Sequence, residues 1–134
     1  MTIIVLDASS TVRTKIKKLL LEMDSENLDI ELYEDARDAL ESIRNNGAEL
    51  IFSSIETKGL DGISFVDILL SDNPQYVSKL FIVTSQNHNE TVDDIKGVGA
   101  KRFIKKPINE TYFKHFIIPE IEKSLKNERK EEEK

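Results

Sequence analysis

The sequence has 134 residues, a length typical of one globular domain, and a formal net charge of −6. It contains no cysteine, which excludes a disulfide framework, a zinc–thiolate site and a cysteine nucleophile, and which suits a reducing cytoplasm. Its apolar runs are far too short to span a membrane, and its acidic charge balance argues against nonspecific nucleic-acid binding. We therefore expect a cytoplasmic domain with neither a membrane span nor a nucleic-acid partner.

Two hydrophobic periods alternate along the first half of the chain. A continuous apolar run at 3–6 predicts a strand buried on both faces. Helical spacing follows from Val12 to Met23, after candidate N-caps at Ser9 and Ser10. Alternation of apolar and acidic residues over 28–32 predicts a strand nearer the edge of a sheet. A second helix over 36–43 is closed by Asn45, Asn46 and Gly47.

The second half repeats this alternation. Strands are predicted at 50–52, 80–83 and 103–104; helices at 63–70, at 92–95 with an end at Gly97 or Gly99, and from Asn109–Glu110 onward. Asn73–Pro74 ends the third helix, while Pro119 should break or kink the fifth helix or restart it. We predict one domain over residues 1–126 and a charged tail over 127–134 that frays into solvent or weakly extends the last helix.

Five strands alternating with five helices predict an α/β fold, a doubly wound parallel sheet in the flavodoxin-like order 2-1-3-4-5. In such sheets the working site lies beyond the carboxyl ends of the strands. The candidate site residues are therefore those that directly follow each strand. They are Asp7, Ala8 and Ser9; Ser53 and Ser54; Thr84 and Ser85; and Lys105, Lys106 and Pro107.

Several short motifs stand at these strand ends. Asp7 ends the first strand, Leu60-Asp61-Gly62 follows the third, Thr84 ends the fourth and Lys106-Pro107 follows the fifth. Each motif alone is common, but their joint occurrence in this order is specific. Over about residues 2–126, the chain resembles the receiver domain of bacterial response regulators. The resemblance implies the fold above and a role in two-component (phosphorelay) signalling.

The resemblance also implies a phosphoacceptor pocket, and this chain departs from it at several positions. In the family, two adjacent acids end strand one and hold Mg²⁺, but Ala8 replaces the second acid here. The phosphoacceptor aspartate stands seven residues before the aspartate of the Leu-Asp-Gly turn, which is the position of Ser54. Glu56 occupies the position that usually lends Mg²⁺ a backbone carbonyl, and Lys58 stands where a proline is often found.

These substitutions predict a degenerate pocket made of Asp7, Ala8, Ser54, Glu56, Thr84, Lys106 and Pro107. A serine hydroxyl is a weak nucleophile without an adjacent base, and neither His88 nor His115 is expected near the strand ends. With Asp7 as the one retained acid, and Glu56 as a second only if it swings inward, we expect weak or absent Mg²⁺ binding. Lys106 should pair with Asp7 and donate to Ser54 or Thr84. We expect no cofactor and no enzymatic activity.

The leading hypothesis is a pseudo-receiver that works by protein–protein interaction without aspartyl phosphorylation. The resemblance implies a switch and interaction face that includes Thr84 and Phe103, although Phe103 lacks a hydroxyl and is expected to bury as core. The partner could be a histidine kinase, a chemotaxis-type protein or another receiver, or a second copy through helix four, strand five and helix five. The alternatives are a receiver phosphorylated on Ser54 or Asp61, and a module that binds a small anion at Ser9–Thr11.

Overall fold

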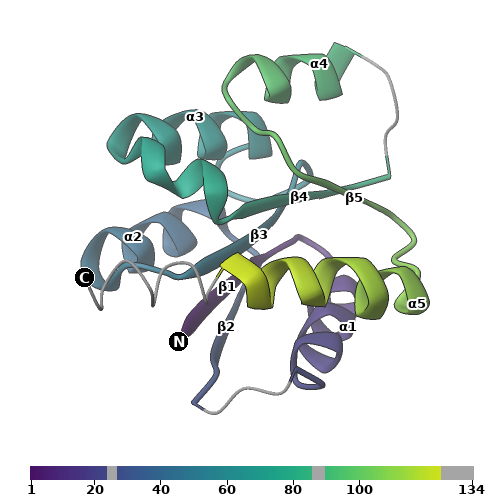
Figure 1. Ribbon diagram of the computed structural model, residues 1–134. Coiled ribbons are helices and arrows are strands. Elements are labelled where there is room, and N and C mark those ends of the chain that lie inside the picture. Colours follow the sequence, from purple (N-terminus) through teal and green to yellow (C-terminus); the bar gives the residue numbers. More distant parts are fainter. Residues whose placement is uncertain (24–26, 86–89, 125–134) are drawn as a thin grey trace.

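A computed structural model describes residues 1–23, 27–85 and 90–124 of the chain. These residues form a five-stranded parallel sheet in the order β2-β1-β3-β4-β5, with helices on both faces (Figure 1). The strands are β1 (Thr2–Leu6), β2 (Asp29–Tyr33), β3 (Leu50–Ser54), β4 (Leu80–Thr84) and β5 (Phe103–Lys105). The predicted fold and strand order are therefore confirmed.

The helices follow the predicted alternation. They are α1 (Ser10–Leu20), α2 (Ala36–Asn46), α3 (Gly62–Asp72), the short 3₁₀-helix η1 (Pro74–Ser78), α4 (Glu90–Gly97) and α5, which begins at Glu110–Tyr112. Ser9, Asp35, Asp61 and Asn109 are the N-caps of α1, α2, α3 and α5, and each side chain accepts a hydrogen bond from a backbone N–H of the first turn. Such caps fix where each helix begins.

The sheet separates two hydrophobic clusters, because successive side chains of a strand point to opposite faces. Ile3 and Val5 of β1 pack with residues of α1 and of the helix that begins with α5. Ile4 and Leu6 pack on the other face with residues of α2, α3 and α4. Figure 1 shows these two helical layers on either side of the sheet. The continuous apolar run at 3–6 is thus explained by burial on both faces.

The predicted position of β2 at the edge of the sheet is confirmed. β2 pairs with β1 alone among the described strands, and its residues are only partly buried, with Leu32 37% exposed. Alternation of apolar and acidic residues fits such a strand, because half of its side chains face solvent. No helix among residues 1–23, 27–85 and 90–124 combines the length and apolarity needed to cross a membrane.

Pro119 does not interrupt the last helix, so of the predicted outcomes a break and a restart were wrong, while the helix does change its hydrogen-bond pattern locally before the proline. The helix continues from α5 through a π-helical stretch, η2 (Phe113–Ile117), and onward over 118–124. The Ile118 N–H donates to the Phe113 carbonyl, five residues back. In a regular α-helix the proline ring would clash with the carbonyl four residues back, and the wider turn before Pro119 avoids this clash. Proline has no N–H, so it cannot make the regular α-helical hydrogen bond, and the π-helical pattern before it no longer requires that bond.

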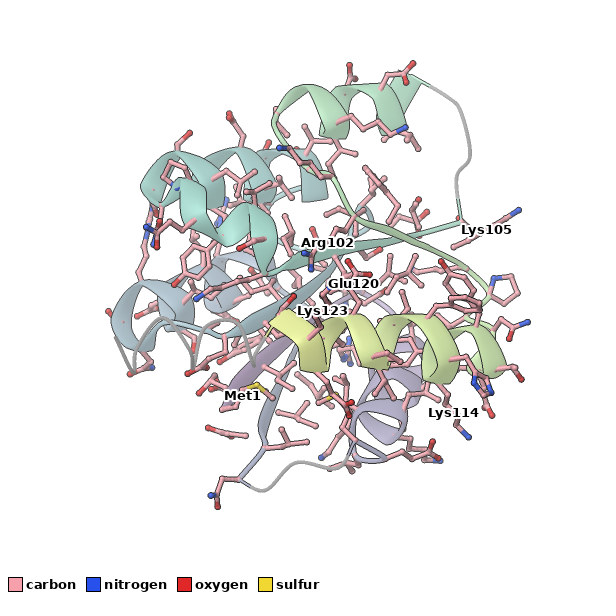
Figure 2. The ribbon with its side chains drawn as sticks, viewed as in Figure 1. Met1, Arg102, Lys105, Lys114, Glu120 and Lys123 are labelled. Atoms are coloured by element: carbon pink, nitrogen blue, oxygen red, sulfur yellow. The ribbon has the colours of Figure 1, made fainter. Side chains whose placement is uncertain are left out.

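Ion pairs join this helix to its neighbours on either side. Arg102 Nε lies 3.5 Å from Glu120 Oε1, and Figure 2 shows the two side chains facing each other between β5 and the helix. Lys114 Nζ lies 3.1 Å from Glu22 Oε2, beyond the end of α1. The predicted tail at 127–134 and His88 lie outside the described residues, while His115 is exposed on the helix.

Candidate functional site

The predicted site residues meet at the carboxyl ends of the strands. Asp7 follows β1, Ser54 ends β3, Thr84 ends β4 and Lys106 follows β5. Parallel pairing brings these ends to one edge of the sheet, since Leu6 is in register with Ser53 and Thr84 with Lys105. Asp7, Ser54 and Thr84 are all buried, with exposed fractions of 2%, 2% and 6%. These three polar side chains are therefore shielded from solvent.

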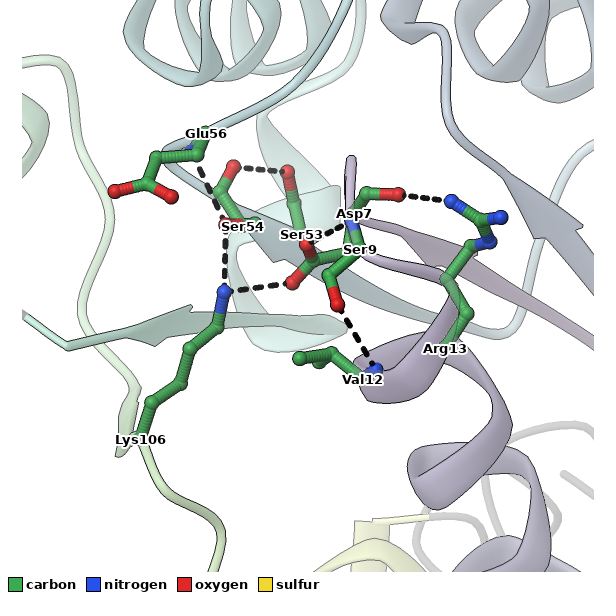
Figure 3. Close-up of polar contacts among 8 residues, drawn as sticks. All are labelled: Asp7, Ser9, Val12, Arg13, Ser53, Ser54, Glu56 and Lys106. Carbon is green, nitrogen blue, oxygen red and sulfur yellow. Dashed lines mark hydrogen bonds and ion pairs between the residues drawn. The ribbon is translucent and has the colours of Figure 1, made fainter.

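An ion pair between Asp7 and Lys106 forms its centre (Figure 3). Lys106 Nζ lies 2.8 Å from Asp7 Oδ2, and the two side chains are only 16% and 3% exposed. Asp7 Oδ1 accepts the Ser9 N–H at 2.8 Å. Oδ2 has no hydrogen bond of regular geometry within the described residues, although the ammonium lies so close. At this distance the Lys106 ammonium supplies the positive charge that balances the buried oxygen.

Ser54 completes the centre as a hydrogen-bond acceptor. Its Oγ accepts from Lys106 Nζ at 3.2 Å and from the Glu56 N–H at 3.0 Å, and Ser53 Oγ donates to the Ser54 carbonyl at 3.1 Å. The serine oxygen therefore stands beside an ammonium ion. A hydroxyl nucleophile needs a neighbouring base to take its proton, and an ammonium ion cannot do so.

Glu56 lies at the edge of the site through its backbone. Its carbonyl accepts the Ala8 N–H at 3.2 Å, while its side chain is exposed. Figure 3 shows the Glu56 carboxylate pointing away from Asp7. In this conformation Glu56 does not act as the second carboxylate that the sequence left open.

The residues present do not fit the Mg²⁺ ion that the resemblance implies. Mg²⁺ needs oxygen ligands in near-octahedral geometry and usually rests on one or two carboxylates and phosphate oxygens. Ala8 offers no side-chain ligand, and the Glu56 carbonyl already accepts the Ala8 N–H. The Lys106 ammonium lies against the retained carboxylate. Across the described parts of the chain, no group of three or more His, Cys, Asp or Glu residues is placed to hold a metal ion.

Arg13 is part of the site and was not assigned a role from sequence. Its Nη1 donates to the Asp7 carbonyl at 2.6 Å, from the first turn of α1 (Figure 3). The Ser9 hydroxyl accepts the Val12 N–H at 3.3 Å and so caps the same helix. A basic side chain four residues after a helix N-cap is a common surface pattern, and only the fold shows that this one turns back toward the strand end.

Thr84 and Phe103 lie on the neighbouring strands β4 and β5. The Thr84 carbonyl accepts the Lys106 N–H at 2.8 Å, which fixes the backbone of the lysine that pairs with Asp7. Pro107 follows Lys106 through a cis peptide bond and is itself exposed. Phe103 is only half-buried, and Lys96 Nζ lies 5.3 Å from its ring centroid. Phe103 also packs against the core cluster that contains Ile4 and Leu6, so its expected burial as core is met only in part, and the remaining exposed side of the ring lies beside Lys96 of α4.

The turn over residues 60–62 starts α3 beside the end of β3. Both carboxylate oxygens of Asp61 accept hydrogen bonds from Ser64, one from its N–H and one from its hydroxyl. These bonds hold the pKa of Asp61 below its usual value. A Cβ on Gly62 would lie 2.5 Å from the Ser54 carbonyl oxygen, so this close approach of two backbones requires glycine.

Known proteins are similar to this chain in sequence. The family model for the response regulator receiver domain matches residues 3–117. The chain is 33% identical over 104 residues to the protein-glutamate methylesterase/protein-glutamine glutaminase of Lawsonia intracellularis. The aligned residues cover 78% of this chain and 29% of that protein. It is 31% identical over 104 residues to the protein of the same name from Pseudoalteromonas translucida, covering 78% and 26% of the two chains. The chain thus spans less than a third of these relatives.

Solved structures agree on the fold. A CheY-like response regulator receiver domain from Methanospirillum hungatei is similar with a TM-score of 0.76 and 21% identity, covering 94% of this chain and 97% of that one. Chemotaxis response regulator CheY4 of Vibrio cholerae is similar with a TM-score of 0.69 and 21% identity, covering 94% and 96%. Because the family model matches residues 3–117, which is most of this chain, the chain belongs to the response regulator receiver domain family.

Proposed function

We propose that this receiver domain acts in two-component signalling by binding a partner protein, without being phosphorylated on aspartate. The observation that carries the proposal is the position of Lys106, 2.8 Å from Asp7 Oδ2 and 3.2 Å from Ser54 Oγ. The lysine balances the one retained acid and donates to the residue at the phosphoacceptor position. The negative charge of the pocket, on Asp7, is thus balanced by the positive charge of Lys106.

Phosphoryl transfer to a receiver places high demands on this pocket. An ionised nucleophile must attack in line, while cations offset the charge on the transferred group. Ser54 is uncharged and accepts hydrogen bonds from Lys106 and from the Glu56 N–H, so its oxygen is poorly disposed to attack. Asp61, the other candidate acceptor, has both carboxylate oxygens engaged by Ser64 at the start of α3. Both observations favour an unphosphorylated module.

The alternative of a small-anion site on α1 receives less support. The Ser9 hydroxyl is used as the cap for the Val12 N–H, and Asp7 lies beside it as a negative charge that would repel an anion. We therefore assign the Ser9–Thr11 segment a structural role in starting α1.

We place the partner, a histidine kinase, a chemotaxis-type protein or another receiver, on the face formed by α4, β5 and α5. The exposed aromatic side chains Tyr112 and Phe116 support this choice, being 48% and 63% exposed with ring centroids 5.1 Å apart. Exposed aromatic residues are enriched at protein interfaces. The same pair would serve a homodimer, which sedimentation velocity over a range of concentrations tests directly. The domain itself is proposed to be non-enzymatic and cytoplasmic.

Intact-mass spectrometry after incubation with acetyl phosphate and Mg²⁺ tests the central proposal. We expect the mass of the native protein to stay unchanged. The matched variant Ala8→Asp/Ser54→Asp restores the two missing acids and should gain one phosphoryl group, which shows that the assay works on this scaffold. Phosphate on the native protein would overturn the proposal, and peptide mapping would then identify the acceptor.

A further inference from the structure

The segment that follows β3 does not simply turn into α3. Residues 56–60, called the strap here, run from β3 across the end of β1 to the end of β2. The Glu56 carbonyl accepts the Ala8 N–H at 3.2 Å, and Lys58 forms a parallel bridge with Asp35. Because β1 lies between β3 and β2 in the sheet, a segment that runs from β3 to β2 must pass the carboxyl end of β1, which Asp7 follows.

The bridge to β2 consists of two backbone hydrogen bonds. The Lys58 N–H donates to the Glu34 carbonyl at 3.0 Å, and the Ala36 N–H donates to the Lys58 carbonyl at 2.8 Å. The Lys58 and Glu34 side chains add an ion pair at 3.2 Å, but they are 61% and 53% exposed, so this contact contributes little. Segments with few buried apolar contacts and exposed backbone bonds open most readily, and Glu56, Lys58 and Gly59 of the strap are all exposed.

Gly59 is the residue that allows the strap to close. Its φ is +81°, and a Cβ at this position would lie 2.2 Å from Asp35 Oδ1. Asp35 Oδ1 is also the cap that accepts the Arg37 N–H at 2.8 Å at the start of α2. Any side chain at residue 59 would therefore be strained by its own backbone and would collide with the cap of α2.

We propose that the strap is the gate of the site: its bridge to the end of β2 keeps Asp7 and Ser54 away from solvent, and its release exposes them. Three features carry this inference: the 2% exposure of both residues, the route of residues 56–60 past the carboxyl end of β1, and the small number of bonds that hold the bridge. The biological use of the gate rests on the proposed function, because a pocket that is not phosphorylated needs another event to change its state.

Thiol labelling tests the gate, because the chain has no cysteine and Ser54→Cys introduces a single one. The nearby Lys106 ammonium favours the reactive thiolate, so the rate of iodoacetamide labelling should report access. We expect labelling to be at least about tenfold faster when Gly59→Ala is added, because the strap then opens more often. Adding Gly97→Ala is the matched control, since a Cβ there meets nothing within 4 Å, and it should leave the rate unchanged.

Equal labelling rates in the folded Gly59→Ala and Gly97→Ala backgrounds would overturn the gate. Where Gly59→Ala does not fold, amide hydrogen exchange on the unmodified chain decides. The amide protons of Lys58 and Ala36 should then exchange at matching rates, slower than unprotected amides and faster than those inside β1. Exchange of the Lys58 amide at the unprotected rate would refute the strap. Neither measurement uses a phosphoryl donor or a partner, so failure here leaves the proposed function standing.

Discussion

Removing Lys106 should destabilise this domain more than removing its partner. At an effective dielectric constant of about 20, charges 2.8 Å apart attract by about 6 kcal/mol, most of which offsets the loss of hydration. Lys106→Met leaves the Asp7 carboxylate buried, with 3% of the side chain exposed, and should lower the free energy of unfolding by about 3–5 kcal/mol. Asp7→Ala leaves an ammonium that is 16% exposed and can turn toward water, so we expect a loss of about 1–3 kcal/mol.

Urea denaturation followed by circular dichroism measures both losses, provided that the m-value stays constant. In a double-mutant cycle, Asp7→Ala/Lys106→Met should cost less than the sum of the single variants by about 1 kcal/mol or more. Lys105→Met is the control, because it removes an exposed lysine one residue away. A loss below about 1 kcal/mol for Lys106→Met, or strict additivity, would refute the view that this pair holds the strand ends together.

Three further predictions follow from the site. Asp61→Ala should lower the free energy of unfolding by about 1 kcal/mol at neutral pH, because it removes the cap of α3. Since the folded-state pKa of Asp61 is lowered, the stabilisation by this carboxylate is present above the unfolded-state pKa and should disappear as pH falls through the folded-state pKa. If urea denaturation shows that Asp61→Ala lowers the free energy of unfolding by the same amount at every pH, this account is contradicted. Gly62→Ala should lower the thermal midpoint far more than Gly97→Ala, since its Cβ would lie 2.5 Å from the Ser54 carbonyl oxygen, and equal midpoints would rule out the close approach. Addition of Mg²⁺ should leave the midpoint of native protein unchanged, whereas a metal concentration of 100 times Kd would stabilise a real site by about 2.7 kcal/mol, so a rise of that size would show that a site exists.

The sequence was sufficient to predict the sheet and the convergence of the site residues. Strands buried on both faces read as continuous apolar runs, as at Ile3–Leu6, and strand ends in a parallel sheet meet at one edge. The sequence alone therefore predicts that Asp7, Ser54, Thr84 and Lys106 lie together. The pairing of Lys106 with Asp7 followed from their opposite charges in a confined space.

The other features could not be predicted, because they depend on contacts that do not require particular side chains. The bridge between Lys58 and Asp35 and the bond from Ala8 to Glu56 join backbone atoms, which every residue carries. The direction of the Glu56 side chain depends on the path of the strap. The uninterrupted helix at Pro119 depends on a local change of hydrogen-bond pattern that residue propensities do not encode.

The division of the core by the sheet also affects how the protein can change over time. Ile3 and Val5 belong to one cluster, while Ile4 and Leu6 belong to the other, so adjacent residues of β1 pack against different sets of neighbours. Substitutions in clusters that share no side-chain contacts act on stability almost additively. Core substitutions under α1 and α5 should therefore leave the packing under α2, α3 and α4 nearly unchanged, whereas a surface that combines α4 with α5 draws one helix from each layer.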